Sequence, residues 1–250
     1  MDIEKIVSEV IKEVQSREPE PCAASSLSAR AWEVPSKLEH SILNPDVSRD
    51  KILAECANAK RHCVAAVCVA PYYVSAAKEA LLGSGVKVCA AIGFPHGCMS
   101  AASKLMEARE CVKNGADELD VAVNILAVKS GNMADAKDDF EQIALVTRGH
   151  TTLKAVFEHS LYTDDEKRSV LEMAKSCGAE YVKIQNVLSG KGADAEDIRY
   201  VKNILARNMK IKIDGGVKTL EKALELLSAG ADRIGLTATV AIAKEAEGKL

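Results

Sequence analysis

Eight short apolar runs, separated by amphipathic stretches, constrain the fold of this chain more than any other feature. We expect strands at 38–43, 65–69, 86–93, 118–124, 153–159, 181–187, 210–215 and 233–236. Helical periodicity between them predicts helices that include 101–114, 134–147, 164–176, 195–206 and 219–229. Eight alternating units favour an α/β fold, a parallel (β/α)8 TIM barrel. A doubly wound open sheet is the alternative, and the lack of a Gly-x-Gly-x-x-Gly motif after the first run weakens it.

Glycines at three junctions support this alternation. Gly115, Gly178 and Gly230 each stand between a predicted helix and the next predicted strand. Many helices end at a residue in the left-handed conformation, which glycine adopts without steric cost. We therefore expect these three helices to end at their glycines.

Composition excludes several classes of partner. The 250 residues, 48% of them hydrophobic, suit one large barrel or two smaller domains. A net charge of −3 offers no electrostatic footprint for nucleic acid or an anionic membrane. No segment approaches the roughly 20 apolar residues that span a bilayer, and charges interrupt the N-terminus where a signal peptide would be apolar. We expect a cytoplasmic protein with reduced cysteines and neither nucleic acid nor membrane as partner.

The N-terminus forms a separate unit. Its pattern predicts an amphipathic docking helix over 1–15, a flexible linker over 16–35 and a barrel domain over 36–250. The apolar stripe of the helix consists of Ile3, Ile6, Val7, Val10, Ile11 and Val14. Two interpretations stay open: the stripe packs on the barrel, or it docks in a groove of another protein.

Two lysines lie inside apolar runs, where an ammonium group is unusual. Period-two alternation places Lys183 on one face of its run, and Lys212 on one face of the next. Neighbouring parallel strands are about 5 Å apart, so the two amines could meet in one cavity. Burial and a second cation both favour the neutral amine, which attacks carbonyls to form a Schiff base. The alternative is that both heads are solvated.

Other polar residues could join these lysines at the carboxyl ends of the strands, where barrels carry their active sites. Asp120 would transfer protons through a water or a substrate hydroxyl, or would simply form an ion pair with a lysine. His40, His96 and His159 lie near the ends of the first, third and fifth runs. Their spacing lacks a metal-ligand signature, so we expect polar lining or packing, and no metal.

The segments after the seventh and eighth strands predict an anion site. Gly215 and Gly216 end the seventh run, and Gly235 lies in the eighth. Glycine amides can approach an anion closely, and barrels commonly bind phosphate at these two loops. Lys218 would add positive charge there, or is solvated.

Six segments in order resemble the deoxyribose-phosphate aldolase family of class I aldolases, and the resemblance extends over residues 38 to 245. They are 39–46, 67–74, 92–97, 114–125, 181–183 and 211–221. The resemblance implies a (β/α)8 barrel that reversibly cleaves 2-deoxy-D-ribose 5-phosphate to acetaldehyde and glyceraldehyde 3-phosphate, with no cofactor. It implies that Lys183 forms the Schiff base, that Lys212 perturbs it, and that Asp120 moves protons with a water.

The same resemblance implies a substrate-binding shell and a partner. The residues that would contact substrate or phosphate are Gly215, Gly216, Gly235, Lys218, Thr237 and Asn186. We expect a sugar phosphate and an aldehyde as small-molecule partners, and a homo-oligomer, most simply a dimer.

The chain departs from the family pattern around this shell. Lys183 is followed by Ile-Gln-Asn-Val in place of Thr-Ser-Thr-Gly, and Asp214 replaces the usual Ser before Gly-Gly. Lys218 stands for an Arg, which removes bidentate geometry. Two rival interpretations stay open: a retired aldolase that acts as a binding or scaffolding protein, and an aldolase with an altered sugar acceptor.

Residues 1–15 and their linker resemble the short encapsulation peptides that target enzymes into bacterial microcompartments. This resemblance implies a shell or cargo protein as a partner. A compartment would suit an aldolase that releases acetaldehyde, which is volatile and reactive.

Overall fold

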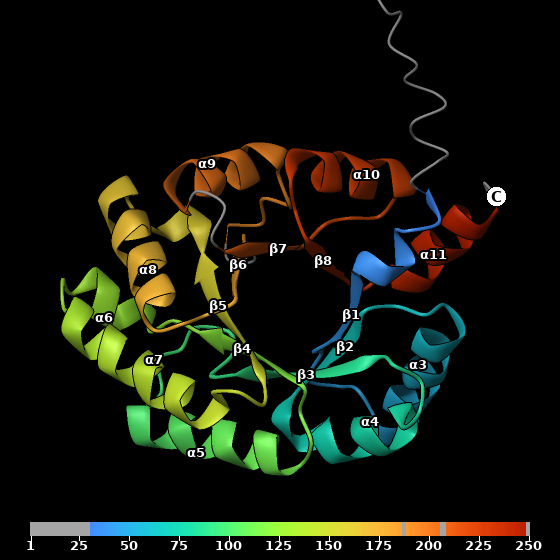
Figure 1. The fold of residues 1–250 in the computed structure, drawn as a ribbon, viewed down its shortest axis with the longest axis horizontal. Helices are drawn as coiled ribbons and strands as arrows, with labels where there is room; N and C mark the ends of the chain where they lie inside the picture. The colour runs from blue at the N-terminus through green and yellow to red at the C-terminus, as the bar shows by residue number, and fades with distance from the viewer. Residues whose placement is uncertain (1–30, 187–188, 206–208, 249–250) are drawn as a thin grey trace, which may run out of the picture.

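The computed structural model describes residues 31–186, 189–205 and 209–248. Eight parallel strands pair in chain order and close into a barrel, and helices surround it as a ring (Figure 1). The strands are β1 (Leu38–Ile42), β2 (Ala66–Val69), β3 (Lys87–Ile92), β4 (Glu118–Ala122), β5 (Thr152–Glu158), β6 (Tyr181–Gln185), β7 (Lys210–Asp214) and β8 (Arg233–Leu236). The predicted TIM barrel is confirmed, and the open-sheet alternative is wrong because β1 pairs with β8.

The helices of the ring are α3 (Arg49–Arg61), α4 (Val74–Leu81), α5 (Ala101–Lys113), α6 (Ile125–Lys129), α7 (Met133–Thr147), α8 (Asp164–Ser176), α9 (Ala195–Leu205), α10 (Leu220–Ala229) and α11 (Thr239–Glu247). Three short 3-10 segments join them: η1 (Pro35–Lys37), η2 (Pro71–Tyr73) and η3 (His159–Leu161). Gly115, Gly178 and Gly230 all have positive φ, as their positions predict. Within the described residues, none of the helices is long and apolar enough to cross a membrane.

The two faces of the barrel strands bury different chemistry. Outward residues such as Val182, Ile184 and Ile213 belong to the main hydrophobic core beneath the helices. The alternate, inward residues of β6 and β7 include two lysines that are fully buried. Period-two alternation therefore separates an apolar layer, which holds the fold together, from a charged interior.

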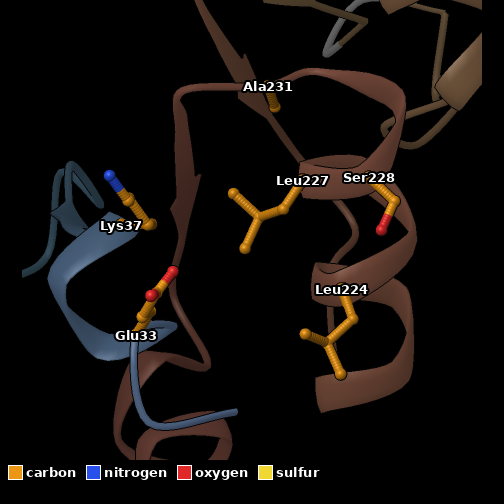
Figure 2. Close-up of a pocket in the computed structure, with 6 residues that line it drawn as sticks. All are labelled: Glu33, Lys37, Leu224, Leu227, Ser228 and Ala231. Atoms are coloured by element: carbon orange, nitrogen blue, oxygen red, sulfur yellow. The ribbon is translucent and has the colours of Figure 1, made fainter. Parts of the chain in front are cut away.

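The described residues ahead of β1 share the hydrophobic core of the barrel. Ala31 and Val34 are fully buried, and η1 leads directly into β1. Glu33 and Lys37 face α10 across a cavity of about 290 Å³ (Figure 2). The chain thus enters at the amino ends of the strands, away from the end where barrels carry their active sites. The predicted docking helix, residues 1–15, and the linker up to residue 30 lie outside the described residues.

Candidate active site

Lys183 and Lys212 meet inside the barrel. They occupy the same register on β6 and β7, and both side chains are fully buried. Asp120 reaches them from β4: its Oδ2 lies 3.0 Å from Lys183 Nζ and 2.6 Å from Lys212 Nζ. The structure therefore brings together the three residues that the sequence analysis singled out for chemistry, in the geometry expected from strand alternation.

Four further charged residues surround this trio, and none of them is among the site residues predicted from the sequence. Lys154 Nζ lies 3.2 Å from Asp120 Oδ1, 2.9 Å from Glu39 Oε2 and 2.5 Å from Glu118 Oε2. Glu39 also pairs with Lys212, and Arg233 Nη1 lies 2.9 Å from Glu118 Oε2. With Asp214, described below, the site holds four cations and four anions: Lys154, Lys183, Lys212, Arg233, Glu39, Glu118, Asp120 and Asp214.

The carboxylates reverse the expected titration of the lysines. Burial alone would lower the pKa of Lys183, but Asp214 and Asp120 outweigh it and raise that pKa well above its usual range. Burial would also lower the pKa of Lys212. Asp120 and Glu39 outweigh that effect and raise it. The expectation of a partly neutral Lys183 near pH 7 is therefore wrong for this state. Lys183 is an ion-paired ammonium that must lose a proton before it can attack a carbonyl.

Asp214 is the one of these eight residues that stands at the carboxyl end of its strand. Its Oδ2 is 2.7 Å from Lys183 Nζ, and its side chain is 14% exposed whereas that of Asp120 is fully buried. Period two places it on the inward face of β7, two residues beyond Lys212. Asp214 therefore lies between Lys183 and the carboxyl end of the barrel.

One group of side chains in the described residues has the spacing of metal ligands. Ligand atoms of Glu39, Cys68, Cys89 and Asp120 all lie within 4.8 Å of one another. However, ammonium groups of Lys154 and Lys212 already contact both carboxylates. A divalent cation would meet two positive charges at hydrogen-bond distance, so these donors fit the lysines better than a metal.

The predicted phosphate residues lie at three separate places. Gly215, Gly216 and Gly235 lie together at the ends of β7 and β8, where Ala193 N donates to Gly215 O. Lys218 is exposed just beyond them. Thr237 is exposed too, and lines a cavity with His40 between α3 and α11.

Asn186 is held away from the lysines. Its Nδ2 donates to Asp197 Oδ2 on α9 at 2.7 Å, and to Gly192 O at 3.4 Å. The Asn186 side chain therefore braces the segment that packs against Gly216.

His40 and His159 do not converge on one pocket. His40 contacts Glu55 on α3 and Thr239 on α11, on the outer side of β1. His159 Nε2 lies 3.3 Å from Asp197 on α9. β1 and β5 lie opposite each other in the closed strand order, so these two residues serve different helix contacts.

One of these four additional site residues, Lys154, could have been predicted from the sequence. Lys154 lies in the predicted run 153–159, and the argument from a lysine within an apolar run applies to it as it does to Lys183. Glu39, Glu118 and Arg233 stand at or next to run ends, where charge is ordinary. Only the closed barrel shows that Glu39 and Glu118 meet Lys154 across the interior, and that Arg233 joins them through Glu118.

Comparisons with known proteins agree with this geometry. A family described as "Histidine biosynthesis protein" matches residues 146–247, less than half of the chain. Deoxyribose-phosphate aldolase from Staphylococcus carnosus (strain TM300) is 40% identical over 205 residues, which are 82% of this chain and 93% of the relative.

Solved structures point the same way. The structure of "QR15, an Aldolase" superposes with a TM-score of 0.82 at 30% identity, and covers 87% of this chain and 97% of its own. A structure described as "Unique tetrameric structure of deoxyribose phosphate aldolase from Aeropyrum pernix" has a TM-score of 0.80 at 22% identity, which supports the fold alone; it covers 91% of this chain and 99% of its own. With the barrel, the buried lysine pair and a relative at 40% identity, the chain belongs to the deoxyribose-phosphate aldolase family of carbon–carbon lyases.

Proposed function

We propose that this chain is a class I aldolase that reversibly cleaves 2-deoxy-D-ribose 5-phosphate, or a close analogue, to acetaldehyde and glyceraldehyde 3-phosphate. The observation that carries the proposal is the shared carboxylate oxygen: Asp120 Oδ2 lies within 3.0 Å of Lys183 Nζ and within 2.6 Å of Lys212 Nζ. A buried amine between a carboxylate and a second cation is suited to covalent carbonyl chemistry.

The residues would act in sequence during cleavage. Lys183 attacks the carbonyl of the open-chain sugar and forms an iminium with loss of water. Asp120 holds a water that takes the proton of the C3 hydroxyl as the C2–C3 bond breaks, while the iminium takes up the electron pair as an enamine. That water then passes the proton to C2 of the enamine, so that none stays on Asp120. Lys212 remains charged throughout, because Glu39 and Asp120 hold its proton. The phosphate would bind at the amides of Gly215, Gly216 and Gly235, near Lys218.

The test is covalent trapping at Lys183. The protein is incubated with 2-deoxyribose 5-phosphate or acetaldehyde, treated with borohydride and digested for mass spectrometry. We expect a reduced adduct on Lys183 and release of glyceraldehyde 3-phosphate from the sugar phosphate. A folded protein that forms no adduct would support the rival interpretation of a retired aldolase with a scaffolding role.

One contact favours a second candidate, an aldolase with an altered acceptor. The Asp214 carboxyl group lies against Gly235, so close that a Cβ added there would be 2.7 Å from Asp214 Cγ. A carboxylate beside an amide intended for phosphate repels the anion. Comparison of kcat/KM for 2-deoxyribose 5-phosphate and for unphosphorylated 2-deoxyribose separates the two candidates, because a phosphate-selective enzyme must favour the first.

We propose that residues 1–15 dock the enzyme to a shell or cargo protein of a bacterial microcompartment. The proposal rests on the apolar stripe in the sequence and on the entry of the chain at the amino ends of the strands. A partner bound to such a segment would leave the carboxyl ends of the strands open to substrate.

The docking proposal is tested with a single charge placed on either face of the predicted helix. Ile6→Asp interrupts the stripe, and Ser8→Asp adds the same charge to the polar face. We expect Ile6→Asp and deletion of residues 1–20 to abolish co-purification with shell proteins while turnover stays unchanged. Co-purification that survives the deletion contradicts the proposal.

We also propose that the chain forms a homo-oligomer, most simply a dimer. Large apolar side chains are exposed on the ring, among them Tyr72 at 87% and Leu82 at 76%, and the Aeropyrum pernix aldolase is described as tetrameric. Light scattering after size-exclusion chromatography gives the mass directly, and a monomer at micromolar concentration contradicts the proposal.

A further inference from the structure

Asp214 contacts the reacting lysine but has no role in the reaction proposed above. Its Oδ2 lies 2.7 Å from Lys183 Nζ, closer than Asp120 Oδ2 at 3.0 Å. Among the described residues, Lys183 is the one cation within ion-pair distance of Asp214. Its side chain is partly exposed, and it lies on the side from which a substrate would approach.

Asp120 is poorly suited to take the proton of Lys183. Its two oxygens face three ammonium groups, those of Lys154, Lys183 and Lys212. Burial would raise the pKa of Asp120, but the three lysines outweigh burial and hold that pKa well below its usual range. A carboxylate stabilised by three cations is a weak base, and a proton left on it would disturb all three contacts.

The backbone leaves room for Asp214 at this place. Gly235 pairs with it in register on β8, and a Cβ there would lie 2.7 Å from both Cγ and Oδ1 of Asp214. The φ of Gly235 is not in the left-handed region, so the strand geometry itself would accept a side chain. The Asp214 carboxyl group thus occupies the space that a side chain at position 235 would take.

We propose that Asp214 is a further catalytic residue, a carboxylate that carries protons between Lys183 and the carbonyl oxygen during imine formation. The inference rests on the Schiff-base activity proposed above. The Lys183–Asp214 pair is close but not aligned as a hydrogen bond, and catalytic contacts commonly tighten when substrate binds.

The steps balance without another reactant. Asp214 takes one proton from the Lys183 ammonium, and the neutral amine attacks the aldehyde carbon. The resulting alkoxide takes that proton from Asp214, which gives a carbinolamine with a protonated nitrogen. Asp214 then accepts a proton from this nitrogen and returns it to the hydroxyl group. Water leaves, and Lys183 is an iminium with Asp214 again ionised. The hydrolysis of the product imine uses the same steps in reverse.

The experiment measures imine formation with acetaldehyde alone, so that no phosphate contact enters the result. Enzyme and acetaldehyde are mixed at pH 7, quenched with borohydride at successive times, and the adduct on Lys183 is counted by mass spectrometry. The variants are Asp214→Asn, Asp214→Glu and Asp194→Asn. Asp194 is a matched control, since it lies at the same end of the barrel and pairs with Lys191 and not with Lys183.

A proton-carrying role and a simple charge-pairing role of Asp214 predict opposite changes in the rate of imine formation. The groups that face Lys183 are Asp120 from β4, Cys68 from β2, Lys212 from β7 and Asp214 itself. If Asp214 only held the ammonium, Asp214→Asn would free the amine and imine formation would become faster. If Asp214 carries the proton, we expect imine formation to be about 100-fold slower in Asp214→Asn. We also expect partial recovery in Asp214→Glu and no change in Asp194→Asn.

The outcomes decide the matter. A rate in Asp214→Asn that is unchanged, faster, or slower by less than about tenfold overturns the proposal. If that variant does not fold, Gly235→Ala carries the same comparison, because it displaces the Asp214 carboxyl group without removing it. A wild-type protein that forms no adduct defeats the Schiff-base activity itself, which the wild-type control distinguishes from a failure of Asp214 alone.

Discussion

The floor of the site and its mouth differ in how many oppositely charged partners each side chain has. The floor consists of Glu39, Asp120, Lys154 and Lys212. The mouth consists of Asp214 and the segments 189–193 and 215–216. Every floor residue is buried and contacts at least two opposite charges. At the mouth, Asp214 has one such partner, and Gly215 and Gly216 carry no side chain.

This difference indicates where the chain can vary. A change in the floor leaves a buried charge unpaired, which is costly, whereas a change at the mouth alters a partly exposed group. Two departures from the family pattern, Asp214 and Lys218, lie at or just beyond the carboxyl end of β7. In the proposed reaction, the floor residues surround Lys183 with fixed charges, and the mouth would contact the part of the substrate that does not react.

The largest effect should come from the reacting amine. Lys183→Arg keeps a positive charge but removes the nucleophile, so we expect cleavage of 2-deoxyribose 5-phosphate to fall by about 10⁴-fold or more. The measurement is the release of glyceraldehyde 3-phosphate with a coupled assay. Lys210→Arg is the control, because Lys210 is exposed at the opposite end of β7 and should tolerate the exchange. Substantial activity in Lys183→Arg would remove Schiff-base chemistry from the proposal.

The next largest effect should be on stability, and should come from Glu39, a floor residue with no direct role in bond breaking. Glu39→Gln leaves Lys154 and Lys212 each without one carboxylate, and we expect the free energy of unfolding to fall by about 3–5 kcal/mol. Urea titration measures it. Glu225→Gln breaks an exposed ion pair with Lys222, and should cost about 0–1 kcal/mol. Equal costs in the two variants would mean that burial does not govern the floor.

Sequence reasoning reached the barrel and the Lys183–Lys212 pair because both depend on local periodicity. Strand alternation sets which residues face inward, and equal spacing puts the two lysines in one register. The pKa of Lys183 was predicted in the wrong direction because it depends on Asp214 and Asp120, one of which reaches it from a distant strand. Glu39 and Lys154 are 115 residues apart in the chain, and no local pattern relates them.

The floor also predicts how stability depends on pH. Burial would raise the pKa of Glu39, but Lys154 and Lys212 lower it from 4.5 to about 2. Its stabilisation is therefore complete above pH 4.5 and is lost as pH falls towards 2. We expect the free energy of unfolding to fall by up to about 1.4 kcal/mol per pH unit from this group within that window. Glu39→Gln should flatten this slope, and Glu225→Gln should not; an unchanged slope in Glu39→Gln contradicts the assignment.

The smallest expected effect tests the mouth. Lys218 is exposed and offers a point charge, whereas an arginine would offer two parallel donors to a phosphate. If Gly215, Gly216 and Gly235 bind the phosphate, Lys218→Arg should raise kcat/KM for 2-deoxyribose 5-phosphate by about fivefold, as one added hydrogen bond would. The value for unphosphorylated 2-deoxyribose should not change. Lys222→Arg, on the same side of the barrel but paired with Glu225, is the control. An equal gain with both sugars would mean that the arginine acts on Lys183 through the local field, since only a phosphate contact can favour one substrate over the other.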